Sequence, residues 1–383
     1  MRICILSPVY PINSNAHLGI FVHEQAKYLV RKRHNVHVIT LGDSKDKDFE
    51  VKEGVKVSRI KIGHFLFFKS LFFALFMLKK LIELNKKHDF DIIHSHFVGT
   101  LTAMIGIASR IIKKPLVTTA HGIGLLSDYG LIRFLTGFYL SFPLKIICVS
   151  NYVAELASKY TTKNKILVIN NGLDPEKLKS TISISDFKKK LRLGNEKILL
   201  SVGNLVERKG IDIIIKSLPQ IIKIYPHIKY FVIGDGSEKE NLNRLVKELG
   251  IEKYVVFIDY VSDSDLANFY NICDIFILMS KTIKEKEGIE GFGIVYIEAS
   301  YFGKPVIGGK SGGTADSIID GVTGYRIEPT DVDELVNKVA LLLKNGKLRR
   351  KLGQQGRNWV KAKLLWSHNA KKLIKVYDQL IKK

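Results

Sequence analysis

Residues 198–225 read ILLSVGNLVERKGIDIIIKSLPQIIKIY, and they contain one complete unit of the pattern that decides the fold. The apolar run 198–202 has the length of a buried strand. A polar loop with the adjacent cations Arg208 and Lys209 follows it, and residues 212–225 have the apolar spacing of a helix. A strand followed by a helix predicts a βα unit, because parallel neighbouring strands need a crossover between them.

The same alternation of short apolar runs and helix-like stretches repeats along the chain, in two series of about six strands. The turn-forming residues NNGLDP at 170–175 separate the two series. The expected strands are 2–7, 36–40, 91–94, 116–119, 145–149 and 165–169, and then 198–202, 230–234, 255–258, 275–279, 305–308 and 324–327. We therefore expect an α/β protein with two doubly wound, Rossmann-like domains, residues 1–172 and 173–349.

The end of the chain is expected to return to the first domain. Residues 347–383 have the pattern of a helix, with the apolar anchors Trp359, Trp366, Leu373 and Tyr377. Because this segment is strongly basic, as the first domain is, residues 350–383 are assigned to that domain.

The 383 residues include 60 Lys and Arg against 37 Asp and Glu, and this excess is unevenly distributed. Residues 1–170 hold 24 basic against 11 acidic residues, and the last 33 residues hold nine against one, whereas residues 171–350 hold 27 against 25. A basic surface attracts the phosphates of nucleic acid or of an anionic membrane. The sequence has no zinc-finger, RNP-like or helix-turn-helix pattern, so charge alone supports a nucleic-acid-binding protein.

The three cysteines exclude two classes of small-domain scaffold. Cys4, Cys148 and Cys273 are too few for a disulfide framework and are not spaced for zinc. Free cysteines of this kind are typical of a reducing, cytosolic setting.

Two loops that follow expected strands carry charged side chains, and ligands bind at such positions in open parallel sheets. Arg208 and Lys209 precede a helix that begins near Ile211, which suits a diphosphate; a solvated charged turn is the alternative. The stretch EGFGIVYIE places Glu290 and Glu298 on either side of a glycine-containing corner. These acids could accept hydrogen bonds from sugar and ribose hydroxyls, or could simply favour the start of a helix.

Two further loops follow strands and carry weaker signals. The glycine pair in SGGTAD, residues 311–316, opens a helix and suits a phosphate. His121, in the stretch TAHG at 119–122, lies at the carboxyl end of a strand, where a functional role and a structural one are both open. His94 and His96 end another strand, and without a third metal ligand we interpret them as acceptor-facing or structural.

Taken together and in this order, the motifs resemble those of the retaining glycosyltransferases of family 4. The resemblance covers essentially the whole chain, including NNGLD at the domain junction. It implies the GT-B arrangement, in which two Rossmann-like domains face each other across a cleft and the C-terminal helix returns to the N-terminal, acceptor-binding domain. The second domain then binds the nucleotide-sugar donor.

The resemblance also implies a role for each motif. Arg208 and Lys209 bind the donor diphosphate as it leaves, Glu290 holds the transferred sugar, and Glu298 holds the ribose. His121 faces the sugar from the first domain, so His121, Arg208, Lys209 and Glu290 are the expected catalytic residues. The remaining donor-binding positions are Gly19, Gly203, Val261, Phe292, Gly293, Ile294 and Gly313.

The sequence departs from the family pattern at two positions. His17-Leu18-Gly19 stands where many relatives have two adjacent glycines, and Asp316 stands where Glu is more usual. Both departures put the phosphate-contacting and side-chain roles of those loops in doubt.

The expected reaction needs neither a cofactor nor a metal ion. The loops that carry the site lack an Asp-x-Asp element, and fixed cations can stabilise the leaving group instead. A double displacement needs a carboxylate nucleophile, whereas both glutamates are assigned to hydroxyls. The resemblance instead implies front-face attack on a UDP- or GDP-linked sugar by a glycan or lipid-linked acceptor, in glycolipid or cell-surface polysaccharide synthesis. A sugar-nucleotide epimerase with the same arrangement is the alternative enzyme.

A membrane surface is the expected partner of the basic first domain, and no nucleic acid is expected. The longest apolar run, residues 65–78, is interrupted by Lys69 and falls short of the roughly 20 residues that a span needs. Residues 65–80 hold six phenylalanines and are followed by further lysines, which suits a helix on anionic lipid; a core helix is the alternative. We expect a cytoplasmic protein on the inner face of the cell membrane.

Overall fold

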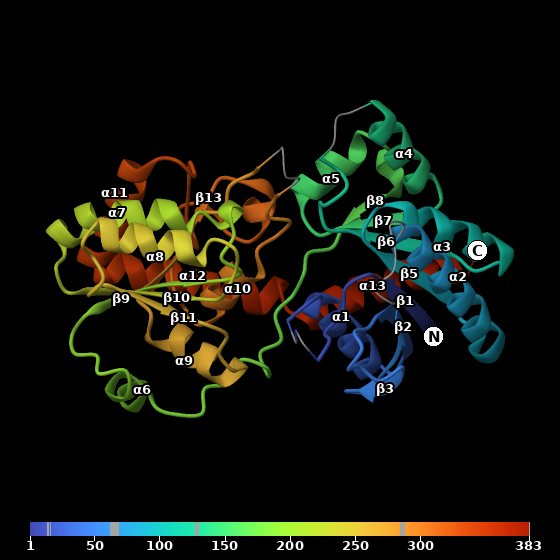
Figure 1. Cartoon of the computed structure of the whole chain (residues 1–383), viewed down its shortest axis with the longest axis horizontal. Coiled ribbons are helices and arrows are strands. Elements are labelled where there is room, and N and C mark those ends of the chain that lie inside the picture. The colour runs from blue at the N-terminus through green and yellow to red at the C-terminus, as the bar shows by residue number, and fades with distance from the viewer. Residues whose placement is uncertain (14, 16, 62–68, 127–129, 284–287, 383) are drawn as a thin grey trace. The chain divides into compact units, whose positions relative to one another are not determined.

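The chain forms two compact units in a computed structural model, which describes residues 1–13, 15, 17–61, 69–126, 130–283 and 288–382. Unit 1 comprises residues 1–172 and 366–383, and unit 2 comprises residues 173–365. Figure 1 shows that both units are sheets covered by helices. The two Rossmann-like α/β domains expected from the sequence are therefore confirmed.

Unit 1 is built on an eight-stranded sheet with the order β3-β4-β2-β1-β5-β6-β7-β8. All its strand pairs are parallel except β3–β4, which is antiparallel. The strands are β1 (Arg2–Ser7), β2 (Asn35–Leu41), β3 (Phe49–Lys52), β4 (Val55–Ile60), β5 (Ile92–His96), β6 (Leu116–Ala120), β7 (Lys145–Cys148) and β8 (Ile166–Val168). The β3–β4 hairpin was not expected, because its exposed residues Phe49 and Val51 do not form a buried apolar run.

Helices cover both faces of this sheet. They are α1 (Ile20–Arg31), α2 (Lys69–His88), α3 (Thr100–Ile111), α4 (Gly130–Ser141), α5 (Asn151–Ser158), the short 3₁₀ helix η1 (Lys163–Lys165) and α13 (Trp366–Ile381). Met77 and Leu81 of α2 and Ile105 of α3 pack against Cys4 and Ile93 of the sheet. The next residue of β5, His94, points to the opposite face and contacts Tyr377 of α13.

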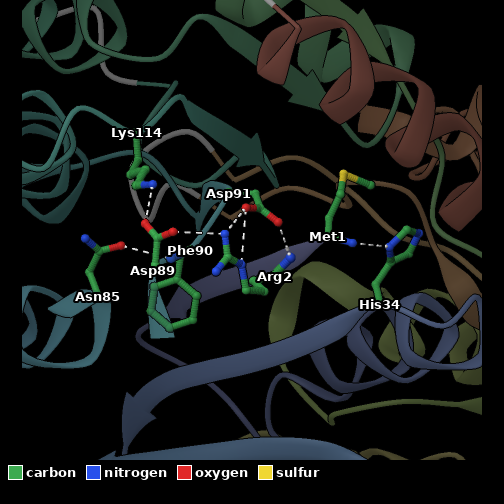
Figure 2. A network of polar contacts seen from close by, with 8 residues as sticks. All are labelled: Met1, Arg2, His34, Asn85, Asp89, Phe90, Asp91 and Lys114. Carbon is green, nitrogen blue, oxygen red and sulfur yellow. Dashed lines mark hydrogen bonds and ion pairs between the residues drawn. The ribbon is translucent and has the colours of Figure 1, made fainter. Parts of the chain in front are cut away.

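A polar network fastens the start of β1 to the loop before β5 (Figure 2). The backbone N–H of Arg2 donates to the carboxylate of Asp91 at 2.6 Å, and the Arg2 guanidinium bonds to the same carboxylate at 2.7 Å. Asp89 accepts from Arg2 at 3.0 Å and from Lys114 at 2.7 Å. These bonds hold the amino-terminal edge of the sheet, opposite the edge at which His121 follows β6.

Unit 2 is built on a six-stranded, wholly parallel sheet with the order β11-β10-β9-β12-β13-β14. The strands are β9 (Lys197–Val202), β10 (Ile228–Ile233), β11 (Val255–Ile258), β12 (Ile275–Leu278), β13 (Val306–Gly309) and β14 (Gly324–Ile327). All six were expected. The order reverses between β9 and β12, and ligands bind at such switch points in open sheets.

The helices of unit 2 lie on both faces of its sheet, with α7 and α8 on one face and α9 on the other (Figure 1). Apolar residues from both layers form one continuous core with the sheet. The helices are α6 (Ile184–Lys190), α7 (Ile211–Ile224), α8 (Lys239–Glu248), α9 (Asp263–Ile272), α10 (Ile294–Tyr301), α11 (Val332–Lys344) and α12 (Gly346–Lys363), with the short 3₁₀ helices η2 (Glu207–Lys209) and η4 (Gly312–Asp316).

The tail that returns to unit 1 begins at Trp366, so its expected start at residue 350 is wrong. The single helix expected over 347–383 is two helices, and α12 stays with unit 2. Leu352 is buried in the core of unit 2, and a Cβ at Gly353 would lie 1.9 Å from the carbonyl oxygen of Gly303. The close approach that this glycine permits holds α12 against the end of α10.

The basic excess belongs mainly to unit 1, although α12 moves part of it to unit 2. Unit 1 holds 29 Lys and Arg against 12 Asp and Glu, whereas unit 2 holds 31 against 25.

The aromatic segment 65–80 is only partly covered by the structure. Residues 65–68, and the side chains of residues 69–74, lie outside the part that the structure describes, so the choice between a lipid-facing and a core helix stays a prediction there. Among the described helices, none is both long enough and apolar enough to cross a bilayer.

Candidate functional site

The loop after β9 is held in place by its two terminal glycines. Gly203 ends the strand at a φ of 146°, and Gly210 precedes α7 in the left-handed region with a φ of 62°. A Cβ at Gly210 would lie 2.1 Å from the carbonyl oxygen of Met279. The intervening turn η2 is tied to the chain beyond β12, because the N–H of Lys281 donates to the carbonyl of Arg208 at 2.8 Å. Both cations therefore lie at the carboxyl ends of the two central strands.

Glu290 is the centre of a buried polar cluster that joins this loop to the chain before α10. Its Oε2 accepts from Lys209 Nζ at 2.5 Å and from Ser280 Oγ at 3.2 Å, and lies 3.5 Å from Arg208 Nη1. Both Glu290 and Lys209 are 8% exposed. The structure thus brings together three of the four expected catalytic residues: Arg208, Lys209 and Glu290.

Burial and charge oppose each other in this cluster. Burial alone would raise the pKa of Glu290, but the nearby cations Lys209 and Arg208 outweigh it and lower that pKa. Burial is also the largest influence on Lys209, and it lowers the pKa of that ammonium despite the carboxylate beside it. The geometry of an ion pair at 2.5 Å indicates that Glu290 is ionised, because two cations face one carboxylate.

Gly313 supports Glu290 through the backbone. Its N–H donates to the carbonyl of Glu290 at 2.7 Å, and a Cβ at Gly312 would lie 2.2 Å from that same oxygen. The glycine pair therefore lets η4 lie directly against the residue that binds both cations. The expected phosphate-cradling role of this turn stays a prediction.

The corner after Glu290 has the form that the glycine spacing predicts. Gly293 precedes α10 with a φ of 89°, and Ile294 is the first residue of the helix. Phe292 is buried at 2% exposure. Glu298, one turn into α10, accepts a hydrogen bond from Tyr270 on α9 at 2.7 Å. Glu298 thus has a partner distinct from those of Glu290.

Two expected donor-binding residues lie in other loops. Val261 precedes α9 and packs at the edge of the unit 2 core. Gly19 precedes α1 with a φ of 60°, and a Cβ there would lie 2.6 Å from the backbone of Val9. Gly19 therefore permits a close approach of the two sides of its own loop, which the sequence pattern alone did not reveal.

His121 joins a stack of histidines at the carboxyl ends of β5 and β6 in unit 1. Its ring centroid lies 5.3 Å from that of His96, which lies 4.7 Å from that of His94. His121 Nε2 is 3.0 Å from His96 Nδ1. The phenyl ring of Phe21 covers His121 with a centroid distance of 4.5 Å. The interpretation of His94 and His96 as structural is supported, because both have protein hydrogen-bond partners.

Burial keeps all three histidines neutral. It lowers the pKa of His94 and that of His121 to about 3 each, and it lowers the pKa of His96 well below its ordinary value. Across the described part of the chain, no three His, Cys, Asp or Glu side chains are grouped so as to hold a metal ion.

Sequence reasoning missed the residues that hold the expected ones in place. Ser280 and Tyr270 are the partners of Glu290 and Glu298, whereas Gln25 and Asn369 extend the hydrogen bonds of His96. Ser280 lies ten residues before Glu290, and the other three lie 28 or more residues from their partners, so no helix or strand spacing marks any of them. The sequence signal that could have indicated such a supporting residue is a polar side chain on the apolar side of a helix, such as Gln25 on α1.

Both units match described protein families. The model of "Glycosyltransferase Family 4" matches residues 18–177, and the model of "Glycosyl transferases group 1" matches residues 182–359. The chain is 33% identical over 174 residues to a GDP-mannose-dependent alpha-(1-6)-phosphatidylinositol monomannoside mannosyltransferase of Mycolicibacterium smegmatis. That match spans 45% of this chain and 46% of the relative, which is less than half of each protein.

Other matches extend over the whole chain. An uncharacterized glycosyltransferase of Methanocaldococcus jannaschii is 28% identical over 98% of both proteins. The solved structure of sucrose-phosphate synthase from Thermosynechococcus elongatus superimposes with a TM-score of 0.83, at 21% identity and over 100% of both chains. At this identity, the similarity to the synthase structure shows a shared fold alone.

Proposed function

The chain belongs to the glycosyltransferases, with a family 4 domain followed by a group 1 domain, and from this premise we propose that it transfers a sugar from a UDP- or GDP-linked donor to a lipid-linked or glycan acceptor. The transfer retains the anomeric configuration, proceeds by front-face attack without a metal ion, and serves glycolipid or cell-surface polysaccharide synthesis. The observation that carries the proposal is the buried cluster of Lys209, Arg208 and Glu290.

The cluster explains how a donor is held and released. Before the donor binds, Glu290 pairs with both Lys209 and Arg208 and keeps these cations at the start of α7. A diphosphate competes for these cations, because it carries more charge and also faces the free N–H groups of the helix. Glu290 then becomes available to accept hydrogen bonds from a hydroxyl of the transferred sugar.

The same two cations account for leaving-group stabilisation without a metal ion. Negative charge grows on the diphosphate as the glycosidic bond to it breaks, and fixed positive groups in a buried site stabilise that charge strongly. In front-face attack the departing phosphate takes the proton of the acceptor hydroxyl, so no carboxylate nucleophile is needed. The name of the mycobacterial relative specifies a nucleotide-sugar donor and a lipid-based acceptor, which supports both substrate classes here.

A thermal-shift screen with UDP- and GDP-sugars tests donor binding. A ligand at 100 times its Kd stabilises the folded protein by about 2.7 kcal/mol, so one nucleotide class should raise the melting temperature clearly. Arg208→Ala should weaken the shift, whereas Lys216→Ala, which removes an exposed lysine of α7, should not. If no nucleotide sugar stabilises the protein, the proposal is wrong.

Incubation with the labelled donor and a membrane lipid extract then tests transfer. We expect label in a lipid or glycan product with the anomeric configuration of the donor, in the presence of a chelator. A donor that is isomerised but not transferred would instead indicate an epimerase.

Helix α4 supports the proposed location on an anionic membrane, because its apolar side faces outward. Leu131 and Phe134 are each 72% exposed and Phe138 is 46% exposed, whereas the polar Thr136 points inward. Arg133 lies exposed on the same helix, and unit 1 is strongly basic. An apolar helix face on a basic domain suits the interface of an anionic lipid bilayer.

Vesicle flotation tests this location. The protein should float with vesicles that contain phosphatidylglycerol and not with vesicles of phosphatidylcholine alone. Phe134→Asp should abolish flotation, and Val51→Asp, at another exposed apolar residue of unit 1, should not. Equal loss in both variants would contradict the proposal, as would self-association of the protein that disappears in Phe134→Asp.

A further inference from the structure

A series of buried hydrogen bonds runs from the backbone of Asn170 to His121, through one side chain each of α13, α1 and β5. Asn369 Nδ2 is 2.8 Å from the carbonyl oxygen of Asn170. Asn369 Oδ1 is 3.2 Å from Gln25 Nε2, and Gln25 Oε1 is 3.2 Å from His96 Nε2. His96 Nδ1 is 3.0 Å from His121 Nε2. Gln25, His96 and Asn369 are each at most 3% exposed, so water does not substitute for these partners.

The Asn170 carbonyl, at one end of this series of hydrogen bonds, sets the direction of the first bonds. A backbone carbonyl can only accept, so the group of Asn369 that faces it must be the NH₂. The oxygen of Asn369 then faces Gln25, which must offer its own NH₂. The oxygen of Gln25 is thereby turned toward His96.

The same reasoning continues through both imidazoles. Because an amide oxygen only accepts, His96 must carry its proton on Nε2. A neutral His96 then has a lone pair on Nδ1, which accepts from His121. His121 must therefore carry its proton on Nε2.

We propose that Gln25, His96 and Asn369 are positioning residues that hold His121 as the Nε2–H tautomer, so that its Nδ1 lone pair accepts a hydrogen bond from a substrate hydroxyl. Nδ1 of His121 has no partner among the residues that the structure describes, and the side chain is partly exposed. The assignment of the hydroxyl to the sugar or acceptor rests on the proposed function. The assignment of the tautomer does not.

The surroundings of the three stacked imidazole rings favour their neutral form. Burial lowers the pKa of His121 to about 3, and no carboxylate is among the causes that act on the three stacked rings. A group with so low a pKa is a poor general base at neutral pH. A neutral His121 keeps the lone pair on Nδ1 that the hydroxyl contact requires.

Imidazole ¹⁵N spectroscopy of the full chain tests the tautomer directly, since protonated and unprotonated ring nitrogens have well separated shifts. The protein without substrate should show His121 with a protonated Nε2 and an unprotonated Nδ1, assigned by comparison with His121→Gln. The opposite pattern would overturn the proposal, whether or not the protein is a glycosyltransferase.

Two variants test the positioning role. Gln25→Leu removes the acceptor of His96, so the ratio of the two His121 tautomers should fall about tenfold, as expected for the loss of one buried hydrogen bond. Thr118→Val is the matched control. It removes the buried Ser95–Thr118 hydrogen bond between β5 and β6, and none of the hydrogen bonds from Asn170 to His121. If the ratio of the His121 tautomers in Gln25→Leu equals the ratio in Thr118→Val, Gln25 is not a positioning residue.

Titration with the nucleotide sugar that the thermal-shift screen selects tests the hydroxyl contact. The Nδ1 resonance of His121 should shift on binding in the wild-type protein and shift less in Gln25→Leu. A donor that binds without moving this resonance would contradict the hydroxyl contact and leave the donor assignment intact.

Discussion

At the residue scale, one carboxylate, that of Glu290, is shared by two cations, Lys209 and Arg208. Lys209 is as buried as Glu290, whereas the Arg208 side chain is 29% exposed. The two cations are therefore not equivalent, although they are adjacent in sequence. Removal of Lys209 should therefore destabilise the folded protein, because it would leave the buried Glu290 carboxylate without its nearest cation.

Arg208→Ala and Lys209→Ala should consequently differ in their effects on stability. Arg208→Ala should lower kcat by about 10²–10³-fold through lost charge stabilisation, with little change in the free energy of unfolding. Lys209→Ala should also reduce turnover and should destabilise the protein by about 3 kcal/mol. Urea unfolding and kinetics at saturating donor measure both effects. Unchanged turnover in Arg208→Ala would remove the role assigned to it.

The buried His94 should make the folded protein less stable in acid, because its pKa is low. Its pKa is about 3 in the folded protein and about 6.5 in the unfolded chain. Between these values the unfolded state binds a proton that the folded state does not, so stability is complete above about pH 6.5 and declines as the pH falls toward 3.

His94→Gln should make this decline shallower by about 1.4 kcal/mol per pH unit. Glutamine can still bond to Tyr377 and Thr119, the present partners of the ring. Unit 1 can be followed separately by the fluorescence of Trp366 after Trp359→Phe, since each unit holds one of the two tryptophans. An equal pH slope in both proteins would show that His94 is already protonated or not buried.

At the element scale, glycines determine which helices come close. α12 lies against the end of α10 because Gly353 has no side chain, and this contact keeps α12 in unit 2. Helix propensity alone would favour alanine at this position by about 1 kcal/mol. The steric conflict with the Gly303 carbonyl should exceed that gain.

Gly353→Ala should therefore destabilise unit 2 by about 1–3 kcal/mol, as overpacking does elsewhere. Gly346→Ala, in the first turn of the same helix, should be neutral or slightly stabilising, because an added Cβ meets only the flexible Arg350 and Arg349 side chains. Chemical unfolding followed by Trp359 fluorescence compares the two variants. A stabilised Gly353→Ala protein would contradict the packing described for α12.

At the scale of the whole molecule, the last helix completes the first unit. α13 buries Trp366, Leu373 and Tyr377 and supplies Asn369 to the hydrogen bonds that connect Asn170 with His121. These contacts join residues that are more than 190 positions apart in the chain. Unit 1 therefore acquires its full core only after unit 2 has been synthesised.

Truncation after Leu365 tests this dependence. The shortened chain should lose hydrogen-exchange protection in β1, β5 and α1, because His94, Gln25 and the Asn170 carbonyl lose their buried partners. Unit 2 should unfold as in the intact protein, as reported by Trp359. Full protection of β5 in the truncated chain would show that α13 is dispensable.

The sequence alone determined the alternation of strands and helices and the two doubly wound domains, and it located the loops that hold Arg208, Lys209 and Glu290. These features depend on apolar periodicity and on glycine or charge at strand ends, which are local properties. The hairpin β3–β4, the end of α12 and the start of the returning helix depended on packing, since their positions are set by which surfaces meet. Only the tertiary structure placed Glu290 between Lys209 and Arg208, and only it connected Asn170 to His121. A hydrogen bond acquires its direction from both partners, and here those partners are brought together by the fold rather than by their spacing in the chain.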